Sequence, residues 1–341
     1  MPRHRSVQHP TEPEQDNTVL QSSVTVSERA SQQDISGRRL LRYGLGILWV
    51  SAGLLQTQPD MFTPDFYAWY PPKIMESVLQ SVADGQPGWL ASLIHAGSYL
   101  WGLHPVLFNI GAIITQLFAG SLLLFARSRG GVRFGLWLSV AWAAMVWIFA
   151  EGMGGLLTAS TYFDGAPGAA FLYIVAALLL LLPERHWRSR RIHRGLQFAL
   201  AGFWFWMDVL QALPTSGFWM AGTLFSQFAN AAATPQPYVL SFPMQVFALL
   251  TNMHPVGWNL LFVTIMMILS LGTVLWLRQR WFLVFSLAWF GWSWWFAQDF
   301  GNLFSGIGTD VNSIPVLALL FLTSRADIPA QAGNSSLARI A

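Results

Sequence analysis

The chain contains no cysteine and few charged residues. The missing cysteine excludes disulfides, zinc–thiolate sites, iron–sulfur clusters and thiol catalysis. Charged residues make up 10% of the chain, whereas a typical soluble domain has about 25%. Residues 106–126, 134–150 and 165–183 carry no charge at all. Each run approaches the ~20 residues needed to cross a ~30 Å hydrocarbon core, so the sequence predicts an all-α integral membrane protein.

Several catalytic signatures are also missing. The chain has no glycine loop ending in lysine, no metalloprotease His-Glu motif and no hydrolase nucleophile elbow. An ATP-driven pump is therefore not expected, and no ligand spacing predicts a metal site. The sequence pI of about 9.5 does not indicate a nucleic-acid partner, because the basic residues fall in short loops between apolar segments. The expected partner is the lipid bilayer.

Hydropathy predicts eight transmembrane helices. Their approximate ranges are 41–58, 105–126, 134–154, 166–183, 195–213, 255–277, 281–298 and 313–324. With eight spans, every arginine loop falls on one side of the membrane: Arg38, Arg39, Arg42, Arg127, Arg129, Arg133, Arg185, Arg188, Arg190, Arg191, Arg194, Arg278, Arg280 and Arg325. Lys73 is the single basic residue expected opposite, where acidic residues predominate. The positive-inside rule then predicts a plasma (inner) membrane protein with both termini in the cytoplasm.

Two parts of the chain resemble each other. Residues 86–109 align without gaps to 236–259, and 138–157 to 285–304. The matched pairs include Gln86/Gln236, His104/His254, Pro105/Pro255, Asn109/Asn259, Trp147/Trp294 and Gly154/Gly301, with a weaker match of Gln56 and Pro59 to Gln211 and Pro214. We therefore expect two parallel four-helix repeats, at 38–184 and 185–325, related by an axis along the membrane normal. Segments 1–37, whose composition is that of a disordered chain, and 326–341 are expected to be cytoplasmic tails.

Each repeat contains a long segment between its first two spans, at 59–104 and 214–254. Residues 73–83 have the pattern of an amphipathic surface helix. Residues 87–103 and 237–253 are moderately apolar and predict either surface or re-entrant helices. Treating them as full spans would scatter the arginines to both sides of the membrane.

The first repeat resembles DoxX-like membrane proteins. The resemblance rests on residues 44–55, GLGILWVSAGLL, and 116–124, QLFAGSLLL, followed by a short basic turn. Gln116 stands where the family usually has an acidic residue, and Met266 takes this place in the second repeat. The resemblance implies a four-helix unit, and in some family members a subunit of a quinone-linked oxidoreductase. It thus implies quinone as a ligand and another membrane subunit as a partner.

Polar residues gather near the predicted outer ends of the spans. The candidate pocket consists of His104, Asn109, Glu151, Asp208, His254, Asn259, Gln298 and Asp299. An ionisable group inside a span, such as Asp208, marks a functional site by default, although pairing with a neighbouring helix would also explain it. The two histidines precede proline at a helix start and either cap helix amides or hold a haem, a metal or a quinone carbonyl.

Three functions follow from these patterns. The first is a DoxX-like component of a quinone-linked redox system at the extracytoplasmic face. The second is a transporter or permease built on the parallel repeat pair, with Asp208 and Glu151 as ionisable groups. The third is a non-catalytic scaffold or assembly factor whose N-terminal tail recruits a partner.

Overall fold

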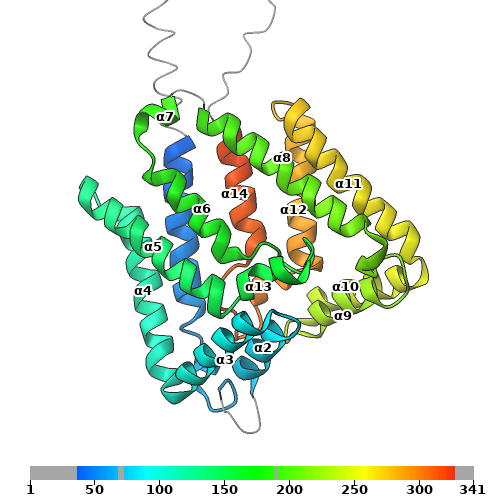
Figure 1. Ribbon diagram of the computed structural model, residues 1–341, viewed down its shortest axis with the longest axis horizontal. Helices are drawn as coiled ribbons and strands as arrows, with labels where there is room; N and C mark the ends of the chain where they lie inside the picture. The colour runs from blue at the N-terminus through cyan, green and yellow to red at the C-terminus, as the bar shows by residue number, and fades with distance from the viewer. Residues whose placement is uncertain (1–36, 68–72, 189–190, 327–341) are drawn as a thin grey trace, which may run out of the picture.

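A computed structural model describes residues 37–67, 73–188 and 191–326 of the chain (Figure 1). Within these ranges every regular element is a helix and there is no β-strand. The predicted all-α class is therefore confirmed for the described part of the chain. The two predicted tails lie outside the described residues, except Gly37, which begins the first helix, and Ala326.

The helices follow one another in a similar order in the two halves. The first half contains a helix at 37–55 (blue and unlabelled in Figure 1), η1 (Pro59–Phe62), α2 (Ile74–Ala83), α3 (Gly88–Leu103), α4 (Pro105–Phe125), α5 (Arg129–Phe149), η2 (Gly152–Thr158) and α6 (Ala169–Leu181). After α7 (Glu184–Arg188) come α8 (Arg191–Ala212), η3 (Pro214–Ser216), α9 (Thr223–Ala233), α10 (Tyr238–Met253), α11 (Pro255–Leu275), α12 (Arg280–Phe296), α13 (Asp299–Asn302) and α14 (Ser313–Arg325). Helices α3 and α10 each have 16 residues, α4 and α11 each have 21, and α6 and α14 each have 13.

Three described helices, α4, α5 and α11, are long and apolar enough to cross a membrane. Helices α6, α10 and α14 are also apolar but shorter. Each of the eight predicted span ranges coincides with a helix, although several ends were misplaced. Helix α5 stops at Phe149 rather than 154, because Gly152, Met153 and Gly154 have positive φ. The first helix ends at residue 55 because Gln58 is extended before Pro59.

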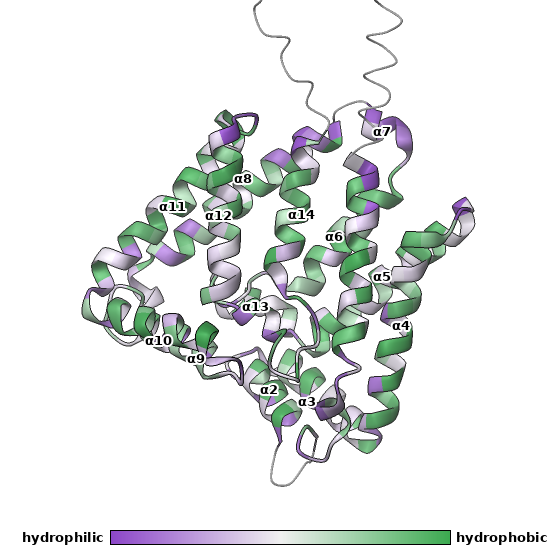
Figure 2. Ribbon diagram, turned by 180° about the vertical axis from the view of Figure 1, so that it is seen from behind, coloured by the Kyte–Doolittle hydropathy of each residue, from purple (hydrophilic) through white to green (hydrophobic). Residues whose placement is uncertain are grey.

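The helices expose large apolar side chains on their outward faces. Phe125 is 75% exposed, Val284 66% and Leu107 65%. In Figure 2 hydrophobic residues run along the outer helices, whereas polar residues gather at α7 and at the α4–α5 and α11–α12 turns. A protein surrounded by water rarely leaves so large a continuous apolar surface uncovered. This surface is suited to contact with lipid chains.

The core joins the two halves. Helix α14 packs against α8 and α12 and also against α6 of the first half. The hydroxyl groups of Tyr162 and Ser293 lie 2.6 Å apart, between the α5–α6 loop and α12. Buried residues from both halves belong to one hydrophobic cluster. The halves are therefore one packed body.

The helices α2, α3, α9 and α10 lie at the end of the bundle away from α7 (Figure 1). The helix predicted at 73–83 is confirmed as α2, which buries Leu79 and Ala83 against Leu90 and Ile94 of α3. Helices α3 and α10 have 16 residues, or about 24 Å at 1.5 Å per residue. This length is below the ~30 Å of a hydrocarbon core.

Candidate functional site

The two histidines do not form a common site. His104 and His254 are exposed, and neither side chain accepts a hydrogen bond from the helix that follows it. They stand at the junctions α3–α4 and α10–α11, on opposite edges of the molecule (Figure 1). The expectation that they cap α4 and α11 is therefore wrong. The structure does not bring the two imidazoles together around a haem, a metal or a quinone.

The two asparagines each bind a glutamine at the end of the first helix of their half. Nδ2 of Asn109 donates to the Gln56 carbonyl over 3.3 Å, and Nδ2 of Asn259 donates to the Gln211 carbonyl over 3.4 Å. The Gln211 amide also donates to Oδ1 of Asn259 over 2.8 Å. Both asparagines are buried. These hydrogen bonds join α4 to the first helix and α11 to α8. They also give the buried polar side chains the partners that such groups need.

Glu151 and Gln298 perform one structural task in the two halves. Carboxylate oxygens of Glu151 accept from the Ala170 amide at 3.1 and 3.2 Å, at the start of α6. Oε1 of Gln298 accepts from the Ile314 amide at 3.4 Å and its Nε2 donates to the Ser313 hydroxyl at 2.7 Å, at the start of α14. Each side chain satisfies the first amides of a helix, which have no partner within that helix. This capping role was not predicted from the sequence.

Two tryptophans support the same loops. Nε1 of Trp147 donates to the Pro167 carbonyl, and Nε1 of Trp294 donates to the Val311 carbonyl, both over 2.9 Å. Each accepting residue lies two positions before the helix that follows, α6 or α14. Their ring nitrogens thus fix the loops that lead into the helices capped by Glu151 and Gln298.

One left-handed turn follows α5 and another follows α12. The φ angles of Gly152, Met153, Gly154 and Gly155 are 53, 57, 63 and 68°, and those of Asp299, Phe300, Gly301 and Asn302 are 45, 50, 71 and 56°. Non-glycine residues adopt this conformation at a cost. A glutamine side chain lies beside the turn in both halves. Nε2 of Gln86 donates to the Gly152 carbonyl over 3.3 Å, and Gln236 lies near the Asp299 side chain.

Carboxyl groups meet where the two loops approach each other. Burial, followed by the nearby Asp310 carboxylate, raises the pKa of Glu151 to about 8. Burial also raises the pKa of Asp310, and that of Asp299 to about 7. Because Gly168 adjoins Glu151 and Gly165 adjoins Gln298, the two caps are neighbours across one short loop. We call Glu151, Gln298 and Asp310 the central cluster.

Asp208 stands apart from the central cluster. It lies in α8, its side chain is buried, and its Oδ1 has no hydrogen-bond partner among the described residues. Of the eight predicted pocket residues, the structure thus brings Glu151 and Gln298 together, with Asp299 beside them in the chain. Asp310, whose position in a loop gave no signal beyond its charge, belongs with them.

An apolar groove of about 410 Å³ lies near this cluster. Its walls are the first helix, α12 and α14, and it is lined by Gly44, Ile47, Leu48, Leu287, Phe290, Gly291, Trp294, Ile314, Pro315, Ala318, Leu319 and Leu322. Trp294 donates to the Val311 carbonyl, next to Asp310, and the Ile314 amide donates to the Gln298 side chain. The groove has the size of an ordinary ligand pocket, and its lining is apolar throughout.

Among the described residues, no group of three or more histidine, aspartate or glutamate side chains is placed to hold a metal ion. No family model, curated protein or solved structure matches the chain. The geometry of the groove and the central cluster is therefore the basis for the function.

Proposed function

We propose that the chain spans the membrane with eight helices in two equivalent four-helix halves, with the arginine turns in the cytoplasm. The eight helices coincide with the predicted ranges, and the three long apolar ones support the membrane location. The matched hydrogen bonds of Asn109 and Asn259, and of Trp147 and Trp294, support the equivalence of the halves. A four-helix half is also the unit that the resemblance to DoxX-like proteins implies.

Within this architecture the chain is a quinone-binding component of a membrane redox system. The observation that carries this proposal is the apolar groove, two of whose lining residues, Trp294 and Ile314, hydrogen-bond to the segments beside the central cluster. A quinone combines a planar ring and a long apolar tail with two carbonyl groups. The groove between the first helix, α12 and α14 suits the ring and the tail, and the nearby central cluster supplies polar groups for the carbonyls.

The carboxyl groups suit the proton chemistry of such a ligand. Oxidation of a quinol to a quinone removes two electrons and two protons. The electrons pass to a redox partner in the membrane, and the protons pass to side chains near the ring. Glu151, with a pKa of about 8, gains and loses protons near neutral pH. A group whose pKa lies near the working pH is best suited to proton transfer.

The test measures quinone binding to the purified full chain in mild detergent. A short-chain decyl quinone should quench tryptophan fluorescence saturably, because Trp294 lines the groove. Gly291→Leu places a side chain in the groove, and a Cβ at this position meets no atom within 4 Å, so the fold should survive. We expect its Kd for the quinone to rise at least about tenfold.

The matched control is Gly202→Leu, at an exposed position of α8 where a Cβ also meets no atom within 4 Å. It should bind the quinone as the unmodified chain does. Equal quenching of both variants, or no saturable quenching of the unmodified chain, would reject the quinone site.

A second candidate function is proton-coupled transport, which the buried Asp208 supports. An ionisable group inside a membrane span is costly and usually serves a pathway or a proton relay. Asp208→Asn should then abolish proton flux in reconstituted vesicles, whereas Asp84→Asn, at an exposed position after α2, should leave it unchanged. Equal flux in the two variants would count against transport.

A further inference from the structure

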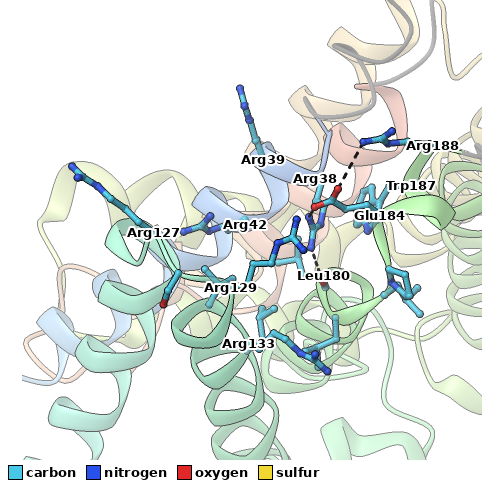
Figure 3. Close-up of a pocket in the computed structure, with 16 residues that line it drawn as sticks. Arg38, Arg39, Arg42, Arg127, Arg129, Arg133, Leu180, Glu184, Trp187 and Arg188 are labelled. Carbon is cyan, nitrogen blue, oxygen red and sulfur yellow. Dashed lines mark hydrogen bonds and ion pairs between the residues drawn. The ribbon is translucent and has the colours of Figure 1, made fainter. Parts of the chain in front are cut away.

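A large cationic pocket lies at the arginine-rich end of the first half. It has a volume of about 710 Å³ and is formed by the start of the first helix, the α4–α5 turn and the α6–α7 segment. Seven arginines and one glutamate, Glu184, line it. Figure 3 shows that the arginines come from all three walls, with Arg39 and Arg127 pointing outward at the rim. Because Glu184 supplies the single negative charge, the pocket is strongly positive.

Among the described residues, four of the seven arginines form no side-chain hydrogen bond or ion pair: Arg39, Arg127, Arg129 and Arg133. Arg38 lies 2.9 Å from Glu184, and Arg188 lies 3.8 Å from the same carboxylate. For Arg129 and Arg133, both exposed, no hydrogen bond or ion pair is formed with any described residue. Exposed guanidinium groups that converge on one pocket without a carboxylate partner suit an anion.

The same region of the second half has a different arrangement. Arg325 of α14 donates to the carbonyls of Gln279 and Arg278 over 3.2 and 3.5 Å, and so joins the end of α14 to the α11–α12 turn. Gln197 occupies the place that Arg42 has in the first half. A general need for positive charge in cytoplasmic loops would apply to both turns. It therefore does not by itself account for the pocket that the arginines of the first half form.

Part of the pocket lining is apolar. It consists of Val132, Leu136, Leu180 and Leu181, of which Leu136 and Leu180 are buried, and we call these four residues the apolar floor. A phosphate suits the arginines, because arginine donates paired hydrogen bonds to phosphate oxygens. Acyl chains suit the apolar floor. Basic pockets between membrane helices are known to accept anionic lipid head groups.

We propose that this pocket binds a phosphate-bearing anion, and that its apolar floor selects an anionic phospholipid. The head-group phosphate contacts Arg129 and Arg133, and the acyl chains follow Leu136 and Leu180. This site shares no lining residue with the apolar groove. Its failure and that of the quinone proposal are therefore distinguishable.

The experiment titrates the purified full chain, in neutral detergent, with dioleoyl phosphatidylglycerol and follows the thermal unfolding midpoint. Dioleoyl phosphatidylcholine and soluble glycerol phosphate serve as the comparison ligands. We expect phosphatidylglycerol to raise the midpoint saturably, because a ligand that binds only the folded state stabilises it. In Arg129→Gln/Arg133→Gln the half-saturating lipid concentration should rise at least about tenfold, since each charged hydrogen bond lost accounts for roughly that factor.

The matched control is Arg278→Gln/Arg280→Gln, which removes two arginines from the corresponding turn of the second half and should titrate as the unmodified chain does. Glu184→Gln removes the one negative charge of the pocket and should lower the half-saturating concentration. Equal titration of the two double variants, or an equal response to phosphatidylcholine, would overturn the site. Saturation by glycerol phosphate at the concentration at which the lipid saturates would overturn the lipid and assign a soluble phosphate compound instead.

Discussion

The turns α4–α5 and α11–α12 are held by similar hydrogen bonds from different side chains. Arg42 donates to the Leu123 and Ala126 carbonyls over 2.7 Å, at the end of α4. Gln197 donates to the Thr273 and Val274 carbonyls over 2.8 and 3.2 Å, at the end of α11. At the other end of the bundle Glu151 and Gln298 cap α6 and α14 in a similar way. In both places the first half uses a charged residue and the second half a neutral one.

This comparison separates what the fold requires from what a site requires. The last carbonyls and the first amides of a helix need any donor or acceptor of the right reach, and glutamine satisfies both. The charges of Arg42 and Glu151 are therefore not explained by capping alone. They occur beside the two features that we assign to ligands, the cationic pocket and the central cluster.

The left-handed turns should be the part least tolerant of change. A Cβ at Gly154 would collide with the Pro167 carbonyl, and φ there is 63°. We expect Gly154→Ala to yield no folded protein, because neither the backbone nor the carbonyl has room to move. Gly111→Ala is the control, since a Cβ there meets nothing within 4 Å. Size-exclusion chromatography should give a single peak for the control, and an equal peak for Gly154→Ala would refute the reasoning.

The Glu151 cap should make stability depend on pH. Its pKa is raised from 4.5 to about 8, so the folded chain binds more protons than the unfolded chain between these values. This contribution is fully present below pH 4.5 and is lost as the pH rises through 8. At about 1.4 kcal/mol for each pH unit, the loss reaches roughly 5 kcal/mol.

Glu151→Gln/Ala169→Ser transfers the cap of α14, Gln298 with Ser313, into the first half. The thermal midpoint of this variant should fall less between pH 5 and pH 8 than that of the unmodified chain. Gln298→Ala is the companion variant, which should lower the midpoint while leaving its pH dependence unchanged. A similar pH dependence in Glu151→Gln/Ala169→Ser and the unmodified chain would contradict the assignment to Glu151.

Trp147 and Trp294 should contribute about equally to the free energy of unfolding. Trp147→Phe and Trp294→Phe each remove one hydrogen bond to a loop carbonyl, and each should lower the free energy of unfolding by about 1–3 kcal/mol. Trp137→Phe, at a position 54% exposed, should have no measurable effect. Chemical denaturation in detergent measures all three. A loss confined to one half would break the proposed equivalence.

Replacing Arg42 with the residue of the second half should have the smallest effect. Arg42→Gln keeps a donor for the end of α4 and should lower stability by less than about 1 kcal/mol, whereas Arg42→Leu loses both bonds and should cost about 2 kcal/mol. The thermal unfolding midpoints of Arg42→Gln and Arg42→Leu measure this difference. If both variants lose the same stability, the charge of Arg42 and not its donors supports the turn.

The sequence predicted the helices well because their signal is local. Long uncharged runs mark helices whose outward faces are apolar, and all eight predicted ranges coincide with helices. The pair His-Pro marks a helix start, which placed α4 and α11 correctly at Pro105 and Pro255. The ends failed where four consecutive residues turn left-handed. Met153 and Phe300 gave no local indication of this conformation.

The candidate site was predicted only in part. Glu151 and Gln298 could be selected from their position, but their partners Ala170 and Ile314 are backbone amides, which carry no sequence signal. His104 and His254 were misleading, because a matched pair at two helix starts says nothing about the distance between the helices. The cationic pocket could not be predicted for a related reason. In the sequence its arginines indicate only orientation, and it is the fold that brings their three separate segments together.

Labelling of single cysteines measures on which side of the membrane each turn lies, and so tests the eight-span arrangement in two parallel halves. Because the chain has no cysteine, each variant carries a single thiol. We would introduce Gly130→Cys and Gln279→Cys at the arginine-rich turns, and Thr158→Cys and Thr215→Cys at the opposite end, all at exposed positions. A membrane-impermeant maleimide applied to intact cells should label positions 158 and 215, and should label 130 and 279 only after permeabilisation. Opposite accessibility of 130 and 279, or of 158 and 215, would contradict the two parallel halves.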